Sequence, residues 1–271
     1  MGVTSHSRVA VVTGASRRAG IGYAIAQALL ADEYRILLHS WARHDECQPW
    51  GADPGGIEAV IESLGGLGPR LKHVERDFEQ ADAPRQVIST AVAEYGTVDV
   101  VVANHAHSAA GSLSTVTVDQ LDRAWAINAR ASVLLAQAYA GQPHPPLEHG
   151  RIILFTSGQH LAPMADELPY AISKGAVHQM TASLADALID RGITVNAINP
   201  GPVDTGWPTH EQRELLSHAF PGGRWGRPRD IADVVRWLAS GSSAWITGQV
   251  INAEGGFRRS AITRGADASD R

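Results

Sequence analysis

The chain has 271 residues, of which 44% are hydrophobic and 19% charged, and its formal net charge is −5 at pH 7. A chain of this length fits one large α/β domain whose core needs no disulfides. The net negative charge argues against a nucleic-acid partner or an anionic membrane surface. The single cysteine, Cys47, excludes an intrachain disulfide and a cysteine-based metal cluster.

The amino-terminal residues Met1–Arg8 are short and polar, and they lead into one apolar run, Val9–Val12. This run is too short for the core of a signal peptide. No stretch approaches the ~18 apolar residues that a membrane span requires. We therefore expect a cytoplasmic protein without a membrane segment.

Seven short apolar segments are predicted to be β-strands. Some are continuous apolar runs, as in Ile152–Phe155, which is typical of parallel strands that are buried on both faces. The predicted strands are Arg8–Val12, Arg35–His39, Leu71–Glu75, Val98–Ala103, Arg151–Thr156, Thr194–Asn199 and Gln249–Asn252.

Amphipathic segments with a helical period lie between these strands. They are Gly22–Ala31, Gly56–Leu64, Pro84–Tyr95, Asp119–Ala140, Tyr170–Asp190 and Arg229–Ala239. Alternating strands and helices predict an α/β fold with a Rossmann-type, doubly wound, seven-stranded parallel sheet in one domain over residues 1–257. Ligands of such sheets bind at the carboxyl ends of the strands.

Three stretches depart from this alternation. Trp41–Gly56 is predicted to be a long loop, since it is rich in Pro, Gly, Asp and Trp. Residues 200–228 contain five prolines and five glycines after a strand end, where a lid over an active site would lie. The tail over residues 258–271 has little apolar content, so we expect it to be flexible.

The first predicted strand runs into the glycine-rich segment Thr13–Gly22, and an alanine-rich helix follows. A strand, a glycine turn and a helix N-terminus let backbone N–H groups bind a pyrophosphate. An ordinary strand-to-helix turn can also contain these glycines, so this segment alone leaves both interpretations open.

A tyrosine and a lysine lie four residues apart in Tyr170-Ala171-Ile172-Ser173-Lys174, which places them on one helical face. A phenol with a pKa of ~10 is a poor base near neutrality, and a nearby ammonium lowers that pKa. The spacing therefore predicts proton transfer by Tyr170. Ser157 ends a predicted strand thirteen residues earlier, where its hydroxyl can hold a carbonyl oxygen.

Together with the pattern Thr13-Gly14…Gly20-Ile21-Gly22, these residues resemble the short-chain dehydrogenase/reductase family, and 3-oxoacyl-carrier-protein reductases in particular. The resemblance extends over about residues 8 to 257. It also includes Asn128, the segment Asn196-Ala197-Ile198-Asn199-Pro200-Gly201-Pro202, and Trp245–Val250 followed by Glu254-Gly255-Gly256.

The resemblance implies a role for each catalytic residue. Tyr170 would be the acid/base, and Ser157 would hydrogen-bond the substrate oxygen. Lys174 would bind the nicotinamide ribose and lower the pKa of Tyr170. Asn128 would hold a water of the proton relay. The implied activity is hydride transfer between a nicotinamide and a carbonyl or secondary alcohol carbon.

Two segments depart from the family pattern. Gly20 lies six residues after Gly14, where four is usual, so we expect the loop to bulge. Where the family reads Asn-Asn-Ala-Gly, this chain reads Ala103-Asn104-His105-Ala106, which we interpret as a local variation in coenzyme packing.

The end of the second strand favours NADP(H) over NAD(H). Members that prefer NAD carry an acid there, and this chain has Ser40. Arg17, Arg18 and Arg43 can supply positive charge to a 2′-phosphate. The expected coenzyme contacts are Gly14, Ser16, Arg17, Arg18, Gly20, Ile21, Gly22, Ser40, Arg43, Asp77, Phe78, Asn104, Tyr170, Lys174, Pro200, Gly201, Val203 and Thr205.

The twelve histidines do not show the spacing of a catalytic metal site, so we expect no metal. Gln159 and His160 follow Ser157 and are candidates for the substrate pocket, as is Trp207 in the predicted lid. The resemblance and the apolar helices also imply a homotetramer.

Three functions are compatible with the sequence. The favoured one is an oxidoreductase of a free small molecule. The second is a 3-oxoacyl-[acyl-carrier-protein] reductase, in which Arg191 matches one docking arginine while Glu148 and Asp186 bring acid to that surface. The third, a non-catalytic NADP(H)-binding sensor, is disfavoured because Asn128, Ser157, Tyr170 and Lys174 are all present.

Overall fold

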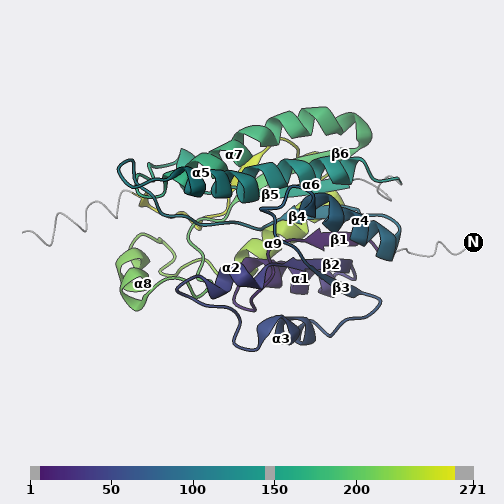
Figure 1. Cartoon of the computed structure of the whole chain (residues 1–271), viewed down its shortest axis with the longest axis horizontal. Coiled ribbons are helices and arrows are strands. Elements are labelled where there is room, and N and C mark those ends of the chain that lie inside the picture. The colour runs from purple at the N-terminus through teal and green to yellow at the C-terminus, as the bar shows by residue number, and fades with distance from the viewer. Residues whose placement is uncertain (1–6, 144–149, 260–271) are drawn as a thin grey trace, which may run out of the picture.

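The computed structural model describes residues 7–143 and 150–259 (Figure 1). Its seven strands form one parallel sheet in the order β3-β2-β1-β4-β5-β6-β7, which confirms the predicted fold class. The strands are β1 (Val9–Val12), β2 (Arg35–Ser40), β3 (Leu71–Glu75), β4 (Val100–Ala103), β5 (Gly150–Phe155), β6 (Ile193–Asn199) and β7 (Val250–Asn252).

The central strands are apolar on both faces because helices cover the sheet on both sides. Val9 and Val11 of β1 belong to one hydrophobic cluster, and Ala10 and Val12 belong to the other. This alternation follows from the two-residue period of a strand. It explains why the strands read as continuous apolar runs rather than as alternating patterns.

Two groups of helices enclose the sheet (Figure 1). One face packs against α4 (Ala83–Tyr95), α6 (Ala131–Ala140) and α7 (Leu168–Leu188). The other packs against α1 (Ile21–Ala31), α3 (Gly56–Ser63) and α9 (Pro228–Ala239). The sheet order reverses between β1 and β4, and a crevice forms outside the strand ends at such a point.

The structure differs from the predicted elements in three places. The predicted loop Trp41–Gly56 contains a short helix, α2 (Ala42–Glu46), and residues 200–228 contain α8 (His210–Ser217). The predicted helix Asp119–Ala140 is divided into α5 (Val118–Ala124), the π-helical segment η1 (Trp125–Arg130) and α6. A π-helical turn inside an α-helix often marks a functional site.

Two predictions lie partly outside the described residues. The expected tail is described only at residues 258–259, and Glu148 falls in the segment 144–149, which is also outside them. Within the described ranges, no helix is both long enough and apolar enough to cross a membrane.

Candidate active site

The glycine turn after β1 is built by close backbone packing. Gly14 has φ +71°, and a Cβ there would lie 2.7 Å from the Cα of His105. A Cβ on Gly22 would lie 2.5 Å from the carbonyl oxygen of Gly14. Asn104 donates from Nδ2 to the carbonyls of Thr13 and Gly14, both at 3.0 Å. This part of the loop therefore accepts only glycine at positions 14 and 22.

Helix α1 begins beside this turn with its first N–H groups free of side-chain caps. Its N-cap, Gly20, makes no capping hydrogen bond, and the first turn contains no acidic residue. A helix N-terminus carries partial positive charge and unpaired N–H donors, which bind phosphate groups. Gly20 and Ile21 line the adjacent pocket, so these donors face a ligand site.

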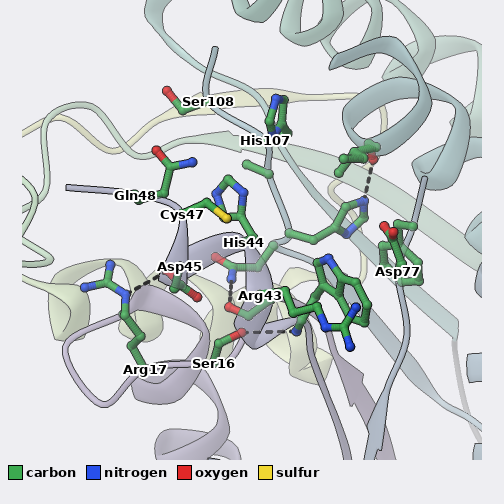
Figure 2. Close-up of a pocket in the computed structure, with 18 of the residues that line it drawn as sticks. Ser16, Arg17, Arg43, His44, Asp45, Cys47, Gln48, Asp77, His107 and Ser108 are labelled. Atoms are coloured by element: carbon green, nitrogen blue, oxygen red, sulfur yellow. Dashed lines mark hydrogen bonds and ion pairs between the residues drawn. The ribbon is translucent and has the colours of Figure 1, made fainter. Parts of the chain in front are cut away.

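The pocket at the strand ends has a volume of about 560 Å³ (Figure 2). Residues of the glycine turn and of the loops after β2, β3 and β4 line it, and Tyr170 lies on its wall. The expected coenzyme residues that the structure brings to it are Gly14, Ser16, Arg17, Gly20, Ile21, Arg43, Asp77, Phe78, Asn104, Tyr170 and Thr205.

Other expected coenzyme residues do not line this pocket. They are Arg18, Gly22, Ser40, Lys174, Pro200, Gly201 and Val203. Ser40 is fully buried, and its Oγ lies 2.8 Å from Nε2 of His73, so its contact with the coenzyme remains a prediction. As the last residue of β2, Ser40 turns this hydroxyl toward β3, away from the pocket.

Arg17 is tied to the segment after β2. Its Nε lies 3.0 Å from Oδ1 of Asp45, and its guanidinium lies 5.6 Å from the ring centre of Trp50. It also donates from Nη1 to the carbonyl of Thr205. Asp45 lines the pocket as well (Figure 2), so the charge of Arg17 is compensated at the place where a phosphate was expected.

Arg18 is held in the same manner by Asp53. Its Nη2 lies 2.7 Å from Oδ1 of Asp53, and its backbone N–H donates to Oδ2 at 2.9 Å. The side-chain hydrogen bond from Arg18 holds the pKa of Asp53 below its ordinary value. Arg18 therefore anchors the loop before α3, and its expected contact with a 2′-phosphate remains a prediction.

Arg43 is the remaining arginine of the three. It is exposed, it lines the pocket, and its guanidinium lies 5.6 Å from the ring centre of Trp41. The N–H of Trp41 donates to Oγ of Ser16, which fixes this segment beside the glycine turn. Among the described residues, Arg43 makes no ion pair.

Three aromatic rings that contact one another line the pocket. His39 stacks on Phe78 with ring centres 4.1 Å apart, and Phe78 meets His105 edge-on at 4.5 Å. Burial lowers the pKa of His39 to about 4 and the pKa of His105 well below its ordinary value. Both imidazoles are therefore neutral packing groups, and His105 also bonds Thr13 and the carbonyl of Ile127.

A pair of histidines joins the two sides of the pocket. The ring of His44, on α2, lies 5.3 Å from the ring of His107, which follows β4 (Figure 2). Burial lowers the pKa of both, that of His107 to about 4. The segment after β2 thus reaches across the pocket to the loop after β4.

Tyr170 lies near the start of α7, and Ser157 follows β5. The Nζ of Lys174 lies 5.8 Å from the ring centre of Tyr170. Burial raises the pKa of Tyr170 to about 12, while a hydrogen bond with Ser157 acts in the opposite direction. For the protein's own residues taken alone, burial is the largest influence on this pKa, and the expected lowering by Lys174 remains a prediction.

Lys174 is itself buried, with 2% of its surface exposed, and its Nζ donates to the carbonyl of Phe155 at 2.7 Å. Burial lowers the pKa of Lys174 to about 7. Its backbone carbonyl accepts a hydrogen bond from Thr156. Helix α7 is therefore fixed against the end of β5 at the level of Ser157.

Asn128 lies in the π-helical segment and connects the loop after β4 to α7. Its Oδ1 accepts the N–H of His107 at 2.7 Å, and its Nδ2 donates to the carbonyl of His107 and to Oγ of Ser173, both at 2.9 Å. The wider π-turn places this amide under the active site. All four expected catalytic residues therefore lie on adjoining elements.

The three substrate-pocket candidates have other contacts. Gln159 donates from Nε2 to Oγ1 of Thr156, and the ring of His160 lies 4.6 Å from the ring of His178. The Nε1 of Trp207 donates to the carbonyl of Val203. None of the three lines the described pocket, so their assignment to the substrate remains a prediction.

Several pocket residues were missed by the sequence analysis, including His39, Trp41, His44, Asp45 and Trp50. All of them lie in β2 or in the segment after it. The available signal was the coincidence of two unusual lengths, the glycine loop and the loop Trp41–Gly56, which both follow strands that are neighbours in the sheet. Within residues 7–143 and 150–259, no group of three or more potential ligands could hold a metal ion.

The residues present suit a nicotinamide dinucleotide. The uncapped N-terminus of α1 fits the pyrophosphate, and the lining of the pocket continues from there to Tyr170. Arg43 offers a cation on the side of β2, where the ribose of the adenosine half would lie. Bound there, the coenzyme supplies the hydride chemistry.

The chain is similar to known oxidoreductases over nearly all of its length. A family model described as Enoyl-(Acyl carrier protein) reductase matches residues 14–258. An uncharacterized oxidoreductase of Bacillus subtilis is 38% identical over 256 residues, which are 94% of this chain and 98% of the relative.

Solved structures agree with this similarity. A blue fluorescent protein from a metagenomic library, in complex with NADPH, has a TM-score of 0.79 and 33% identity, over 92% of this chain and 97% of that one. A promiscuous reductase that catalyses keto-reduction at C1 during lugdunomycin biosynthesis has a TM-score of 0.77 and 32% identity, over 93% of this chain and 98% of that one.

Proposed function

Because the chain belongs to the short-chain dehydrogenase/reductase family, we propose that it transfers a hydride between NADP(H) and the carbonyl or secondary alcohol carbon of a small molecule. The observation that carries this proposal is the position of Tyr170. Tyr170 lines the pocket and makes a hydrogen bond with Ser157, and Nζ of Lys174 lies 5.8 Å from the centre of its ring. This arrangement is suited to moving a proton at the oxygen of a reacting carbonyl.

Each residue has a distinct task in this proposal. Tyr170 donates a proton to the substrate oxygen during reduction and accepts it during oxidation. Ser157 hydrogen-bonds the same oxygen and stabilises its developing negative charge. Lys174, which donates to the carbonyl of Phe155, would bind the nicotinamide ribose, and its ammonium would favour the phenolate. Asn128 keeps the loop after β4 in register with α7 and holds the water of the proton relay.

We assign the 2′-phosphate of NADP(H) to Arg43. Arg17 and Arg18 are already paired with Asp45 and Asp53, while Arg43 is exposed at the pocket and stacked on Trp41. A guanidinium held on an aromatic ring can bind a phosphate through two donors. The relative that was solved with NADPH supports this choice of coenzyme.

The segment 200–228 is proposed to act as the lid. It leaves the end of β6, carries α8 and returns to α9. Within it, Trp207 meets Trp225 edge-on with ring centres 5.7 Å apart, which gives the segment an aromatic core of its own. We place the enzyme in the cytoplasm.

The test is NADPH-dependent reduction of a broad panel of carbonyl compounds, read as loss of nicotinamide absorbance. Tyr170→Phe is expected to remove turnover and leave NADPH affinity nearly unchanged, because the hydroxyl acts in the transition state. The matched control is Tyr23→Phe on α1, which lies outside the pocket lining and is expected to keep the wild-type rate. A Tyr170→Phe variant with most of its rate would refute the assignment.

A second candidate is a reductase of 3-oxoacyl groups on an acyl carrier protein. The description of the matching family model also names an acyl carrier protein, but with enoyl rather than 3-oxoacyl reduction. The docking surface argues for the first candidate. The guanidinium of Arg191 donates to the carbonyl of Ala140, and Asp186 is exposed on the same helical end. Saturable binding of an acyl carrier protein would favour the second candidate, and no binding would favour the first.

A further inference from the structure

The side chain of Arg259 lies against the backbone at the end of β5. A Cβ built on Gly158 would contact the guanidinium of Arg259, with Cζ at 3.1 Å and Nε at 3.4 Å, and its Nη2 closer still. The three atoms nearest to that position all belong to Arg259. Gly158 follows Ser157 directly, so Arg259 packs on the residue next to the proposed oxyanion contact.

The charge of Arg259 is balanced by a buried carboxylate. Its Nη1 donates to Oε2 of Glu254 at 2.9 Å, and its Nη2 donates to Oε1. The side chain of Glu254 is 8% exposed, and that of Arg259 is 22% exposed. A carboxylate this buried is costly without a partner, so the pair holds the last described turn in a fixed position.

Glu254 in turn reaches the segment after β6. Its Oε1 accepts a hydrogen bond from Nδ2 of Asn199 at 2.8 Å, and Oδ1 of Asn199 accepts the N–H of Gly201 at 3.1 Å. Gly201 has φ +61°, and a Cβ there would lie 2.8 Å from Cγ of Glu254. The aliphatic part of the Glu254 side chain therefore packs directly against the Pro200-Gly201 turn.

These contacts connect the ends of three neighbouring strands, β5, β6 and β7. We propose that Arg259 is a positioning residue that, through Glu254 and Asn199, holds the Ser157–Gly158 backbone and the Pro200-Gly201 turn at a fixed separation. The inference rests on the proposed function, in which Ser157 holds the substrate oxygen. A small displacement of a reacting group lowers the rate strongly, so Arg259 acts on turnover without touching the substrate.

The first test replaces Arg259 by Ala, with Arg258→Ala as the matched control. Arg258 is the adjacent arginine and is exposed, and its backbone N–H donates to the carbonyl of Ala219. Arg259→Ala is expected to lower kcat by roughly tenfold and to leave the Kd of NADPH within about twofold, as a positioning effect predicts. Arg258→Ala is expected to change neither. A wild-type kcat in Arg259→Ala would overturn the inference.

A double-mutant cycle separates this role from general stabilisation. Gly158 does not have a positive φ, so its backbone accepts alanine, and the added methyl would displace the guanidinium. Gly158→Ala is expected to lower kcat in the wild type and to have no added effect in the Arg259→Ala background. Additive losses would mean that the two positions act independently. Gly158→Ala also keeps the inference testable if Arg259→Ala does not fold.

Hydrogen exchange gives a readout that does not depend on turnover. Amides of residues 156–162 and 199–203 are expected to exchange faster in Arg259→Ala than in the wild type or in Arg258→Ala. Unchanged exchange in both segments would overturn the inference even if the wild type reduced carbonyls. A wild type that reduced no carbonyl would instead refute the proposed function, and the exchange data would still decide the role of Arg259.

Discussion

Arg17 and Asp45 form an ion pair inside the coenzyme pocket, with 3.0 Å between Nε and Oδ1. Arg17 lies in the glycine turn, and Asp45 lies in α2, within the segment Trp41–Gly56. These are the two segments of unusual length. Arg18 and Asp53 form a second pair between the same segments. The extra residues of the glycine loop therefore serve to fix the loop after β2.

Removal of Arg17 is expected to expose the pocket to an uncompensated carboxylate. Arg17→Ala should weaken NADPH more than NADH, because Asp45 would then repel the 2′-phosphate. Adding Asp45→Asn should restore most of the loss. Both affinities can be measured by titration of nucleotide fluorescence. If the double variant bound NADPH no better than Arg17→Ala, charge repulsion by Asp45 would be excluded.

Coenzyme choice should depend on Arg43. The wild type is expected to bind NADPH more than tenfold better than NADH, which requires only about 1.4 kcal/mol. One charge-assisted contact supplies about that free energy. Arg43→Ala should therefore weaken NADPH by roughly tenfold and spare NADH, whereas Arg18→Ala should not discriminate between them. Equal affinities in the wild type would show that Arg43 does not bind the phosphate.

Gly22→Ala should disturb the glycine turn, because the new Cβ would lie 2.5 Å from the carbonyl oxygen of Gly14. We expect a loss of about 1–3 kcal/mol in the free energy of unfolding, and weaker coenzyme binding. The control is Gly175→Ala on α7, where a Cβ meets no atom within 4 Å. That change should stabilise the helix slightly. Equal stabilities of the two variants by urea denaturation would contradict this account.

The stability of the protein without added nucleotide should rise between pH 7 and about pH 10. Burial lowers the pKa of Lys174 to about 7, so the unfolded state binds the extra proton across that window. Burial of the charged Lys174 destabilises the folded state fully below pH 7, and this effect disappears as the pH approaches the ordinary pKa of lysine. Lys174→Met should remove on the order of 2–4 kcal/mol of this pH dependence. If the free energy of unfolding, measured by urea denaturation, changed with pH by the same amount in both proteins, the lowered pKa of Lys174 would be refuted.

We expect a homotetramer. The apolar segments Ala129–Ala140 and Ala182–Leu188 favour helix packing between subunits, and Trp125 and Ile172 are 51% and 55% exposed on the same helical layer. Closed symmetry would cover such side chains. Light scattering at micromolar concentration should give four times the mass of the chain. A monomeric mass would contradict the expectation, and Trp125→Glu should reduce the mass if these helices form the interface.

The seven strands could be predicted because each contains apolar residues between helical segments, and in β1 and β4 the whole strand is a buried apolar run. The observed β3 has the same bounds as its prediction, and the others differ by one or two residues. Helix α2 was missed because four of its five residues are polar. Contacts made only in the folded chain stabilise it, among them the Arg17–Asp45 ion pair and the ring contact of His44 with His107. The π-helical turn at Asn128 was also missed, because it accompanies hydrogen bonds from the Asn128 side chain to His107 and Ser173, which are distant in the sequence.

The sequence by itself determined the parallel sheet, the glycine turn and the candidate catalytic residues, because apolar runs, glycine positions and the spacing of Tyr170 and Lys174 are local properties of the chain. The tertiary structure decided which charges are available to a ligand. Ser40 turns to His73, Arg17 and Arg18 are paired with aspartates, and Arg43 remains at the pocket. These pairings join residues far apart in sequence, and their energies depend on burial and distance, which only the folded chain defines.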